Sequence, residues 1–358
     1  AAGLIGWMWL TERRAAAAVL GQRFFEDLGF SSDGRVGCVT CHDPRRAFTD
    51  GRRVAVAAGT GTRNTPSLFL APYVSFALWD GAADSLWSQP LMAMENPREH
   101  ATTRLTVAHR VATTYANDYE AVFGPLPPLG EGARFPPSGM PGDPRWEAMS
   151  ASDQTAVNRV VVNVGKAIEA YERTLAVRPT PFDRYVAGDF EAMSPDARDG
   201  LSFMLLFSCM ECHNTPLFSD NRFHALRVPD DPEATRLGGD RGREGVIERL
   251  LASPFNMAGV FSDARDDALL REIERTDLNL GAFRTPTLRG VALTAPYGHA
   301  GALATLTDVV RHDGRGGLPE SDPRALGIPD PRFRPFHATD DQVQKMVAFL
   351  QALTPDTD

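Results

Sequence analysis

Apolar residues recur at helical spacing in several parts of this chain, whereas the strict alternation that is typical of strands is scarce. The segment from Thr11 places Leu20, Phe24 and Leu28 on one face of a predicted helix. A stronger pattern predicts a helix over roughly residues 152–175, whose buried stripe consists of Val157, Val161, Val164, Ile168, Tyr171 and Leu175. The pattern therefore predicts a mainly α fold.

Two more helices are indicated by the residues with which they begin. Ser194-Pro195-Asp196 supplies a capping side chain, a proline at the first turn and an acid near the positive end of the helix dipole, and its helix runs towards Cys209. Thr339-Asp340 begins the other helix, whose inward side chains are Val343, Val347, Leu350 and Leu353.

All four cysteines of the chain lie in two copies of one pattern, because residues 38–42 read CVTCH and residues 209–213 read CMECH. This C-x-x-C-H pattern is the attachment signature of c-type haem. Zinc sites and redox disulfides also use C-x-x-C, but neither explains a histidine at the same offset twice. We therefore expect two covalent c-type haems. Haem 1 is held by Cys38, Cys41 and the iron ligand His42, and haem 2 by Cys209, Cys212 and the iron ligand His213.

The two motifs lie in different halves of the chain, which predicts two cytochrome c-like domains, each with one haem. We expect residues 1–165 to carry haem 1, and residues 166–358 to carry haem 2. The stretch 124–145 has seven prolines and five glycines, so it is expected to be a loop within the first domain.

Composition limits the partners and the compartment. The apolar fraction of 43% and the charged fraction of 23% are those of an ordinary globular protein, and the net charge of −9 argues against nucleic acid as a partner. No run of 18 apolar residues predicts a membrane span. The opening AAGLIGWMWL lacks a basic n-region, so we interpret it as a mature N-terminus left after a signal peptide was removed. Covalent haem implies export, which places the protein in the periplasm.

Three further stretches carry a family resemblance: RNTPSLFLAPYVSFALWDG (63–81), SQPLMAMENPRE (88–99) and RTPTLRGVALTAPYGHAGALATLTDVV (284–310). Together with the haem motifs, they resemble the bacterial di-haem cytochrome c peroxidase and MauG superfamily over nearly the whole chain. The resemblance implies a haem-dependent oxidoreductase that uses hydrogen peroxide and holds one calcium ion between its two haems.

The resemblance also assigns roles to matching residues between the haems. Trp79 matches the tryptophan that lies between them, although plain core packing is the alternative. Asn64 matches the side-chain ligand of calcium, and its alternative is to cap the turn at Thr65. The carbonyls of Thr294 and Pro296 match the backbone ligands of this ion, and oxygen ligands of this kind suit a hard cation.

On the open face of haem 1, Gln89 and Glu99 match polar residues of the family. Glu99 is the candidate acid and base for cleavage of the O–O bond, and a solvated carboxylate is the alternative. His299 matches a histidine near haem 2, where a structural hydrogen bond is an equally good interpretation. No role is assigned to the four histidines His100, His109, His224 and His337.

Three positions depart from the peroxidase pattern. The distal histidine that closes haem 1 in ordinary members is replaced here by Ala58, so we expect haem 1 to be open, as in MauG. The sixth ligand of haem 2 falls in register on Asp313, but the adjacent His312 is the better haem ligand and is our prediction. Asp313, water or a more distant methionine are the alternatives. Ala93 stands where the family usually has proline.

These features favour a MauG-like (MbnH-like) enzyme in which peroxide generates a high-valent, bis-Fe(IV)-like state shared by both haems. The substrate would be an aromatic residue, with tryptophan favoured, of a periplasmic partner protein. Since no tryptophan follows Trp146, electrons from the substrate would have to reach haem 2 through Tyr171, Tyr185 or directly at the haem edge. The alternatives are a cytochrome c peroxidase that takes electrons from a small cytochrome or cupredoxin, and a di-haem electron-transfer protein.

Overall fold

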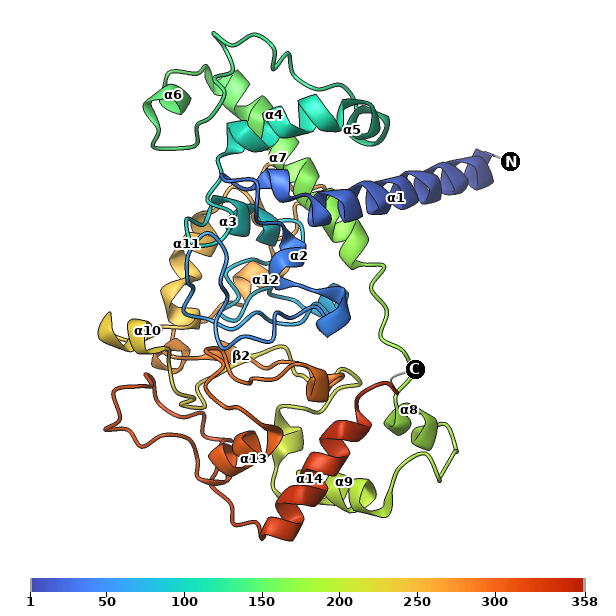
Figure 1. The fold of residues 1–358 in the computed structure, drawn as a ribbon, viewed down its shortest axis with the longest axis vertical. Coiled ribbons are helices and arrows are strands. Elements are labelled where there is room, and N and C mark those ends of the chain that lie inside the picture. The colour runs from blue at the N-terminus through green and yellow to red at the C-terminus, as the bar shows by residue number, and fades with distance from the viewer. Residues whose placement is uncertain (1, 357–358) are drawn as a thin grey trace.

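The structure is a computed structural model that describes residues 2–356, with side chains described from Glu12 onward. Figure 1 shows a mainly helical molecule, with most of the N-terminal half above and most of the C-terminal half below, although residues 247–271 lie beside the N-terminal half. The helices of the first half are α1 (Ala2–Glu26), α2 (Cys38–Cys41), α3 (Gln89–Glu95), α4 (Arg104–Thr114), α5 (Ala116–Phe123), α6 (Pro144–Glu147) and α7 (Ala151–Glu172). Those of the second half are α8 (Pro181–Val186), α9 (Pro195–Leu206), α10 (Pro232–Arg236), α11 (Ile247–Ala252), α12 (Ala268–Arg271), α13 (Leu306–Gly314) and α14 (Asp340–Ala352).

Besides the α-helices, the described residues form one small sheet, several isolated β-bridges and several short turns of 3₁₀ helix. Strands β1 (Phe223–His224) and β2 (Phe283–Arg284) pair antiparallel, and they are the only named strands in residues 2–356. The 3₁₀ turns are Leu28–Phe30, Pro44–Arg46, Ala71–Tyr73, Cys209–Glu211, Arg243–Gly245, Asp277–Asn279 and Val291–Leu293. The expected mainly α fold is confirmed.

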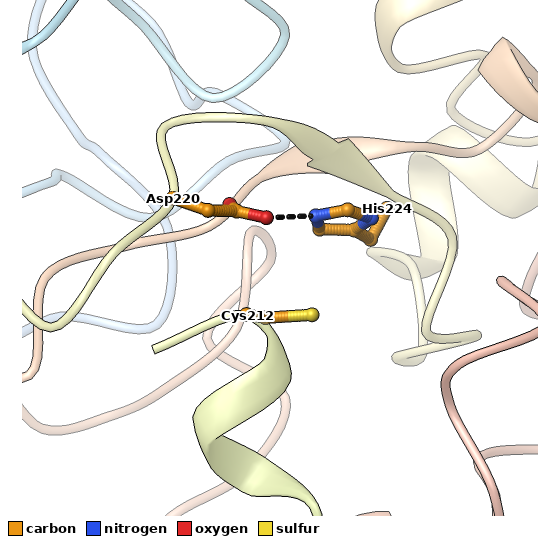
Figure 2. A group of neighbouring side chains, drawn as sticks. All are labelled: Cys212, Asp220 and His224. Carbon is orange, nitrogen blue, oxygen red and sulfur yellow. Dashed lines mark hydrogen bonds and ion pairs between the residues drawn. The ribbon is translucent and has the colours of Figure 1, made fainter. Parts of the chain in front are cut away.

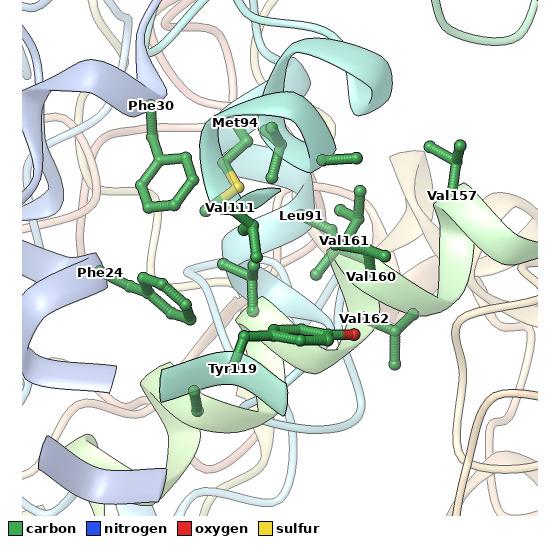
Figure 3. Packing of buried hydrophobic residues seen from close by; sticks show 14 of the residues in the cluster. Phe24, Phe30, Leu91, Met94, Val111, Tyr119, Val157, Val160, Val161 and Val162 are labelled. Atoms are coloured by element: carbon green, nitrogen blue, oxygen red, sulfur yellow. The ribbon is translucent and has the colours of Figure 1, made fainter. Parts of the chain in front are cut away.

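The first half is organised around one large apolar cluster contributed by α1, α3, α4, α5 and α7. Figure 3 shows Phe24 and Phe30 packed towards Met94 and Val111, with the valines of α7 beside them. Val157, Val161, Val164 and Ile168 are all buried, as the periodicity predicts. Leu28, which was expected on the same face as Leu20 and Phe24, is instead 41% exposed, because α1 ends at Glu26 and Leu28 belongs to the next turn.

The second half has its own cluster, built mainly on α9 and α14. Both predicted helix starts are confirmed, because Ser194 Oγ accepts a hydrogen bond from the Ala197 N–H and the Thr339 side chain caps α14 in the same way. Val343, Leu350 and Leu353 are buried and Val347 is partly buried.

Each half contains one close helix crossing that depends on a glycine. A Cβ built on Gly21 of α1 would lie 1.8 Å from the Ala167 carbonyl oxygen of α7, and one on Gly200 of α9 would lie 1.9 Å from the Lys345 carbonyl oxygen of α14. Because these obstacles are backbone atoms, only glycine permits either crossing. The same device in both halves fits the expectation of two similar units.

The division between the halves differs from the predicted boundary at residue 165. That residue lies in the middle of α7, whose buried side chains belong to the first cluster. The chain leaves α7 at Glu172 and enters α8 at Pro181, and the second cluster begins beyond that point. Residues 173–180 are therefore the better boundary, since a single packed helix cannot be divided between two cores.

Ion pairs join the two halves. Arg63 Nε and Nη2 each lie 2.7 Å from the Asp240 carboxylate, and Arg63 also pairs with Asp80. Arg98 pairs with Glu233 of α10 at 2.8 Å. In addition, Phe261 from the second half is buried in the first cluster. The two halves are therefore joined by ion pairs and by a shared apolar contact.

Within residues 2–356, the structure contains no helix that is both long enough and apolar enough to span a bilayer.

Candidate functional site

The first C-x-x-C-H motif forms one short helix, α2, followed directly by its histidine. His42 Nδ1 lies 3.0 Å from the Phe48 carbonyl oxygen. A proton on Nδ1 donates this hydrogen bond, which leaves Nε2 with the lone pair that a haem iron needs. Burial raises the pKa of Cys38 to about 12 and that of Cys41 to about 11. A redox-active C-x-x-C pair would have a lowered thiol pKa, so the redox-disulfide alternative is not supported.

The second motif repeats this arrangement. The 3₁₀ turn Cys209–Glu211 carries the first thiol, and His213 Nδ1 lies 2.6 Å from the Phe218 carbonyl oxygen. Burial raises the pKa of Cys209 to about 12 as well. In both histidines, therefore, Nδ1 is held by a backbone carbonyl, and both rings line the cavity described below.

One cavity connects the two motifs. Its volume is about 1210 Å³, which exceeds the roughly 300–1,000 Å³ of a pocket for one small ligand. Both histidines and three of the four motif cysteines line it, with Cys209 packed just outside. The cavity wall thus brings together residues that are 171 positions apart in the sequence, with the lining taken from both halves.

Trp79 lies in the wall of this cavity and is held by both halves. Its indole N–H donates a 2.9 Å hydrogen bond to the Asn64 carbonyl oxygen, and its own carbonyl accepts one from the Arg284 N–H at 2.8 Å. Trp79 is only partly buried, which sets it apart from Trp87 and Trp146 in the apolar core. These contacts favour the position between the motifs over a plain core role.

The residues expected around calcium also line the cavity. Asn64 is buried, and its Nδ2 donates to the Arg52 carbonyl oxygen at 2.8 Å, so its Oδ1 remains available as a ligand. Thr294 and Pro296 lie in the wall on either side of a cis Ala295-Pro296 bond. No described residue donates a hydrogen bond to either of these two carbonyls. This oxygen donor set suits a hard cation.

The predicted distal residues of haem 1 share one part of the wall. Gln89 and Ala93 lie one turn apart on α3, and Glu99 follows in the loop after it. Glu99 Oε1 accepts a 2.6 Å hydrogen bond from Asn96 Nδ2, and burial raises the pKa of Glu99. A solvated carboxylate would not show this shift, so the burial favours the acid and base role. Ala58 does not line the cavity, and its N–H donates to the Glu99 carbonyl oxygen at 3.1 Å.

The structure does not bring His312 to the site. The lining residues of α13 are Leu306, Val309 and Asp313, which share one helix face. His312 is buried away from that face, and its Nε2 lies 3.2 Å from the Leu226 carbonyl oxygen. Asp313, the residue in family register, faces the cavity instead, and burial raises its pKa to about 7. The rotation of α13 therefore favours Asp313 over our first choice.

Two further predictions are placed by their contacts. His299 lines the cavity, stacks on Phe283 with 3.7 Å between ring centroids, and lies 2.8 Å from Asp230 through Nε2, so it has a structural hydrogen bond. Tyr171 packs on Phe25, which lies 6.4 Å from the His42 ring between ring centroids. Tyr171 therefore lies near the first motif, which does not favour it as a path for electrons into haem 2.

Tyr185 does lie in the second half. It packs edge-on against Phe190, with 5.8 Å between ring centroids, and Phe190 is 65% exposed. Of the two predicted tyrosines, Tyr185 is the one whose neighbours reach the surface near the second motif.

Sequence reasoning missed His224, to which it gave no role. Its two ring nitrogens lie 2.9 Å from Asp220 and 2.7 Å from Asp330. Burial opposes a charge on the ring, but the hydrogen bond with Asp220 outweighs it and the pKa of His224 rises to about 10. Figure 2 shows this pair above the sulfur of Cys212. Cys212, Asp220 and His224 have donor atoms within 4.8 Å of one another, and they are the only such group in the described residues.

This group does not form a zinc site. Both nitrogens of the imidazolium are engaged by carboxylates, and Cys212 belongs to the second haem motif. In the described part of the chain, the donor atoms of Cys38, Cys41 and His42 in the first motif do not all lie within 4.8 Å of one another, so they do not form a metal-binding group either. No sequence signal marked His224, because its partners Asp220 and Asp330 lie 110 residues apart.

Arg284 was also missed as a site residue. It lines the cavity and makes only weak backbone contacts, at 3.5 Å to the Leu78 oxygen and 3.3 Å to the Thr285 oxygen. Burial alone lowers its pKa to about 10. A buried cation without a carboxylate partner is costly, so an acidic group of a bound molecule fits this position. Haem carries such groups, and the residues present therefore fit two c-type haems.

Comparisons with known proteins agree with this site. The family model described as di-haem cytochrome c peroxidase matches residues 15–191. The chain is 30% identical over 357 residues to the cytochrome-c peroxidase IdrP1 of Denitromonas iodatirespirans, covering 95% of this chain and 82% of that protein. It is 29% identical over 339 residues to the methylamine utilization protein MauG of Methylorubrum extorquens, covering 93% and 77%.

Solved structures show the same fold. The diheme peroxidase BthA from Burkholderia thailandensis superposes with a TM-score of 0.70 at 23% identity, over 95% of this chain and 86% of that one. A MauG-like protein associated with microbial copper homeostasis superposes with a TM-score of 0.61 at 22% identity, over 95% and 88%. The chain carries paired C-x-x-C-H motifs on one cavity, and it is 30% identical to the cytochrome-c peroxidase IdrP1 over 95% of its length. It therefore belongs to the di-haem cytochrome c peroxidase family, a family of haem-dependent oxidoreductases.

Proposed function

We propose that this protein is an exported, MauG-like di-haem enzyme that uses hydrogen peroxide to oxidise an aromatic residue of a partner protein. The observation that carries this proposal concerns the residue that matches the distal histidine of ordinary members, which does not line the cavity. At the position of the distal histidine stands Ala58, whose methyl group offers no ligand and whose N–H is tied to the Glu99 carbonyl. Peroxide then needs no reductive activation to reach haem 1.

The two haems, when bound, supply the redox chemistry by giving up two electrons to peroxide. His42 and His213 would hold the irons, and Cys38, Cys41, Cys209 and Cys212 would hold the porphyrins. Arg284 is proposed to neutralise haem propionate, because it is a buried cation that lines the cavity without a protein carboxylate.

The distal side chains hold peroxide and move its protons. Gln89 can donate a hydrogen bond from its amide, and burial raises the pKa of Glu99, which favours Glu99 as the donor of a proton to the leaving oxygen. The Asn96 amide orients the Glu99 carboxyl group at 2.6 Å. Apolar neighbours such as Met92 and Ala93 limit the access of water to this side of the cavity.

Trp79 is proposed to couple the haems electronically. The hydrogen bond between its indole and the Asn64 carbonyl fixes the ring, and a calcium ion on Asn64, Thr294 and Pro296 would stabilise the same segment. A change at the ion would therefore be transmitted to the tryptophan through one residue.

For haem 2, we now propose Asp313 as the side chain presented to the sixth position, since His312 is turned away. An anionic oxygen ligand is expected to keep the potential of haem 2 lower than a methionine would. A low potential lets haem 2 share the oxidation with haem 1. Tyr185 and the exposed Phe190 mark the surface from which a substrate could be oxidised.

The experiment adds one equivalent of hydrogen peroxide to the ferric holoprotein and follows the electron paramagnetic resonance and near-infrared spectra. The proposal expects a high-spin haem 1 before the addition, loss of both ferric signals after it, and a near-infrared charge-resonance band. A low-spin haem 1 in the resting protein would contradict it and favour a di-haem electron carrier. Fast steady-state turnover with a reduced small cytochrome, without the near-infrared band, would instead favour an ordinary peroxidase.

A further inference from the structure

His100 is a buried histidine with no hydrogen bond to its Nδ1. It is 4% exposed and lines the cavity beside Glu99. Its Nδ1 is fully enclosed and has no hydrogen-bond partner, although the Ala93 carbonyl lies close enough to the ring to oppose the effect of burial on its pKa. Nearly all buried polar atoms in folded proteins have a partner, so an imidazole left without one inside a reaction cavity calls for a functional explanation.

The backbone fixes this imidazole on the distal side of haem 1. The His100 N–H donates to the Ala93 carbonyl oxygen at 3.3 Å, and the Thr102 N–H donates to the Met94 carbonyl oxygen at 3.0 Å. The loop after α3 is thereby folded back onto the helix. Since Ala93 lies one turn from Gln89, the same fold places His100 next to the predicted distal residues. The methyl side chain of Ala93 takes up little of the space there.

The neighbouring charges suit a base. Burial lowers the pKa of His100, partly opposed by the nearby Ala93 carbonyl and assisted by His42, so the ring is neutral at pH 7. Burial raises the pKa of the adjacent Glu99. Burial therefore reduces the difference between the pKa values of His100 and Glu99, which makes proton transfer between the two side chains easier.

Resting on the proposed function above, we infer that His100 is a second catalytic residue, the base that takes the first proton from hydrogen peroxide. The imidazole accepts the proton of the oxygen that approaches haem 1, while Glu99 donates a proton to the outer oxygen. The O–O bond then breaks, its electron pair leaves with the outer oxygen, and that oxygen departs as water. The oxygen that remains requires two electrons, which the bound haems would supply. The proton on His100 finally returns to the Glu99 carboxylate, which restores both groups.

This division of labour explains why two ionisable side chains are adjacent at this wall. A protonated carboxylic acid is a good donor but a poor acceptor, whereas a neutral imidazole is a good acceptor. The competing interpretation is that His100 is itself an iron ligand that closes haem 1, and the test must separate the two.

The test compares the ferric holoprotein with His100→Ala and His100→Gln, and uses His109→Ala as the matched control. His109 bonds to the Pro136 carbonyl oxygen at 2.9 Å and does not line the cavity. Two rate constants are measured by stopped flow: reaction with hydrogen peroxide, and association of hydrogen cyanide, which must also lose a proton to bind. The spin state of haem 1 is recorded for each variant.

We expect both rate constants to fall by about 10²-fold or more in the two His100 variants, with haem 1 high-spin throughout and His109→Ala unchanged. Added imidazole should restore part of the rate in His100→Ala. Unchanged rate constants in His100→Ala would overturn the inference. A haem 1 that is low-spin in the wild type and becomes high-spin in His100→Ala would overturn it in favour of an iron ligand. A third outcome separates this inference from the proposed function. If cyanide association is fast in the wild type and slow in His100→Ala, but the wild type does not react with peroxide, the proposed function is refuted while His100 is still shown to act as a base.

Discussion

Replacement of Gly200 by alanine tests how closely α9 and α14 must approach to complete the haem 2 half. In the structure, the new Cβ would lie 1.9 Å from the Lys345 carbonyl oxygen, 2.6 Å from its carbonyl carbon and 3.0 Å from the Phe349 Cβ. Real Cβ atoms essentially never come within 3.0 Å of such neighbours, so the helices must separate by about 1.1 Å at the crossing. The obstacle is backbone, and no side-chain rotation can relieve it.

The magnitude follows from two opposing effects. Overpacking of a well-packed core costs about 1–3 kcal/mol, and a backbone obstacle belongs at the upper end of that range. Alanine in a helix interior returns about 0.5–1 kcal/mol relative to glycine. The net loss is therefore about 2 kcal/mol, which corresponds to a fall in Tm of roughly 4–8 °C for a unit of this size.

The assay is thermal unfolding of the holoprotein, followed by far-ultraviolet circular dichroism and by Soret absorbance. Gly130→Ala is the matched control, because a Cβ at Gly130 meets nothing within 4 Å and should leave Tm unchanged or slightly raised. Gly21→Ala, which meets the Ala167 carbonyl oxygen at 1.8 Å, should reproduce the effect in the haem 1 half. A Gly200→Ala protein that melts with the wild type would refute the interpretation of the crossing as obligatory.

Further predictions concern the cofactor pockets. Asp313→Asn should change the optical and electron paramagnetic resonance spectra of haem 2, whereas His312→Ala should leave them unchanged, because only Asp313 faces the cavity; the reverse result would restore His312 as the ligand. Trp79→Phe should leave both haems attached but weaken the near-infrared band after peroxide, and an unaltered band would exclude Trp79 from the electronic coupling. Removal of calcium with a chelator should mimic Trp79→Phe in part and be reversed by added calcium, and a lack of effect would contradict a calcium site at Asn64. Burial raises the pKa of Glu172 to about 8, so the stabilisation from its neutral form is complete below the unfolded value of about 4.5 and is lost as the pH rises through 8. Glu172→Gln should therefore match the wild type in Tm near pH 4.5 and exceed it above pH 8, where its free energy of unfolding should be higher by on the order of a few kcal/mol; equal Tm values at both pH values would show that the carboxyl group is not buried.

The sequence alone determined what depends on local covalent chemistry and on short-range hydrogen bonds. Two cysteines and a histidine within five residues can attach haem wherever the rest of the chain lies, and the structure then holds Nδ1 of both histidines with a backbone carbonyl. The helix starts at Ser194 and Thr339 are equally local, because each cap is satisfied three residues later.

Only the tertiary structure decided which side chains enter the cavity. His312 and Asp313 are neighbours in the sequence, but they point in directions about 100° apart around the axis of α13. His312 is therefore buried against the Leu226 carbonyl, whereas Asp313 lines the cavity. His100 and His224 were indistinguishable from ordinary histidines until packing left one without a partner and enclosed the other between two carboxylates. The predicted domain boundary at residue 165 differs from the structural one for the same reason, because the buried side chains of α7 on both sides of residue 165 belong to the first cluster. Local patterns set which groups the chain carries, whereas helix rotation and the packing of distant segments set where each group points, and no short stretch of sequence contains that information.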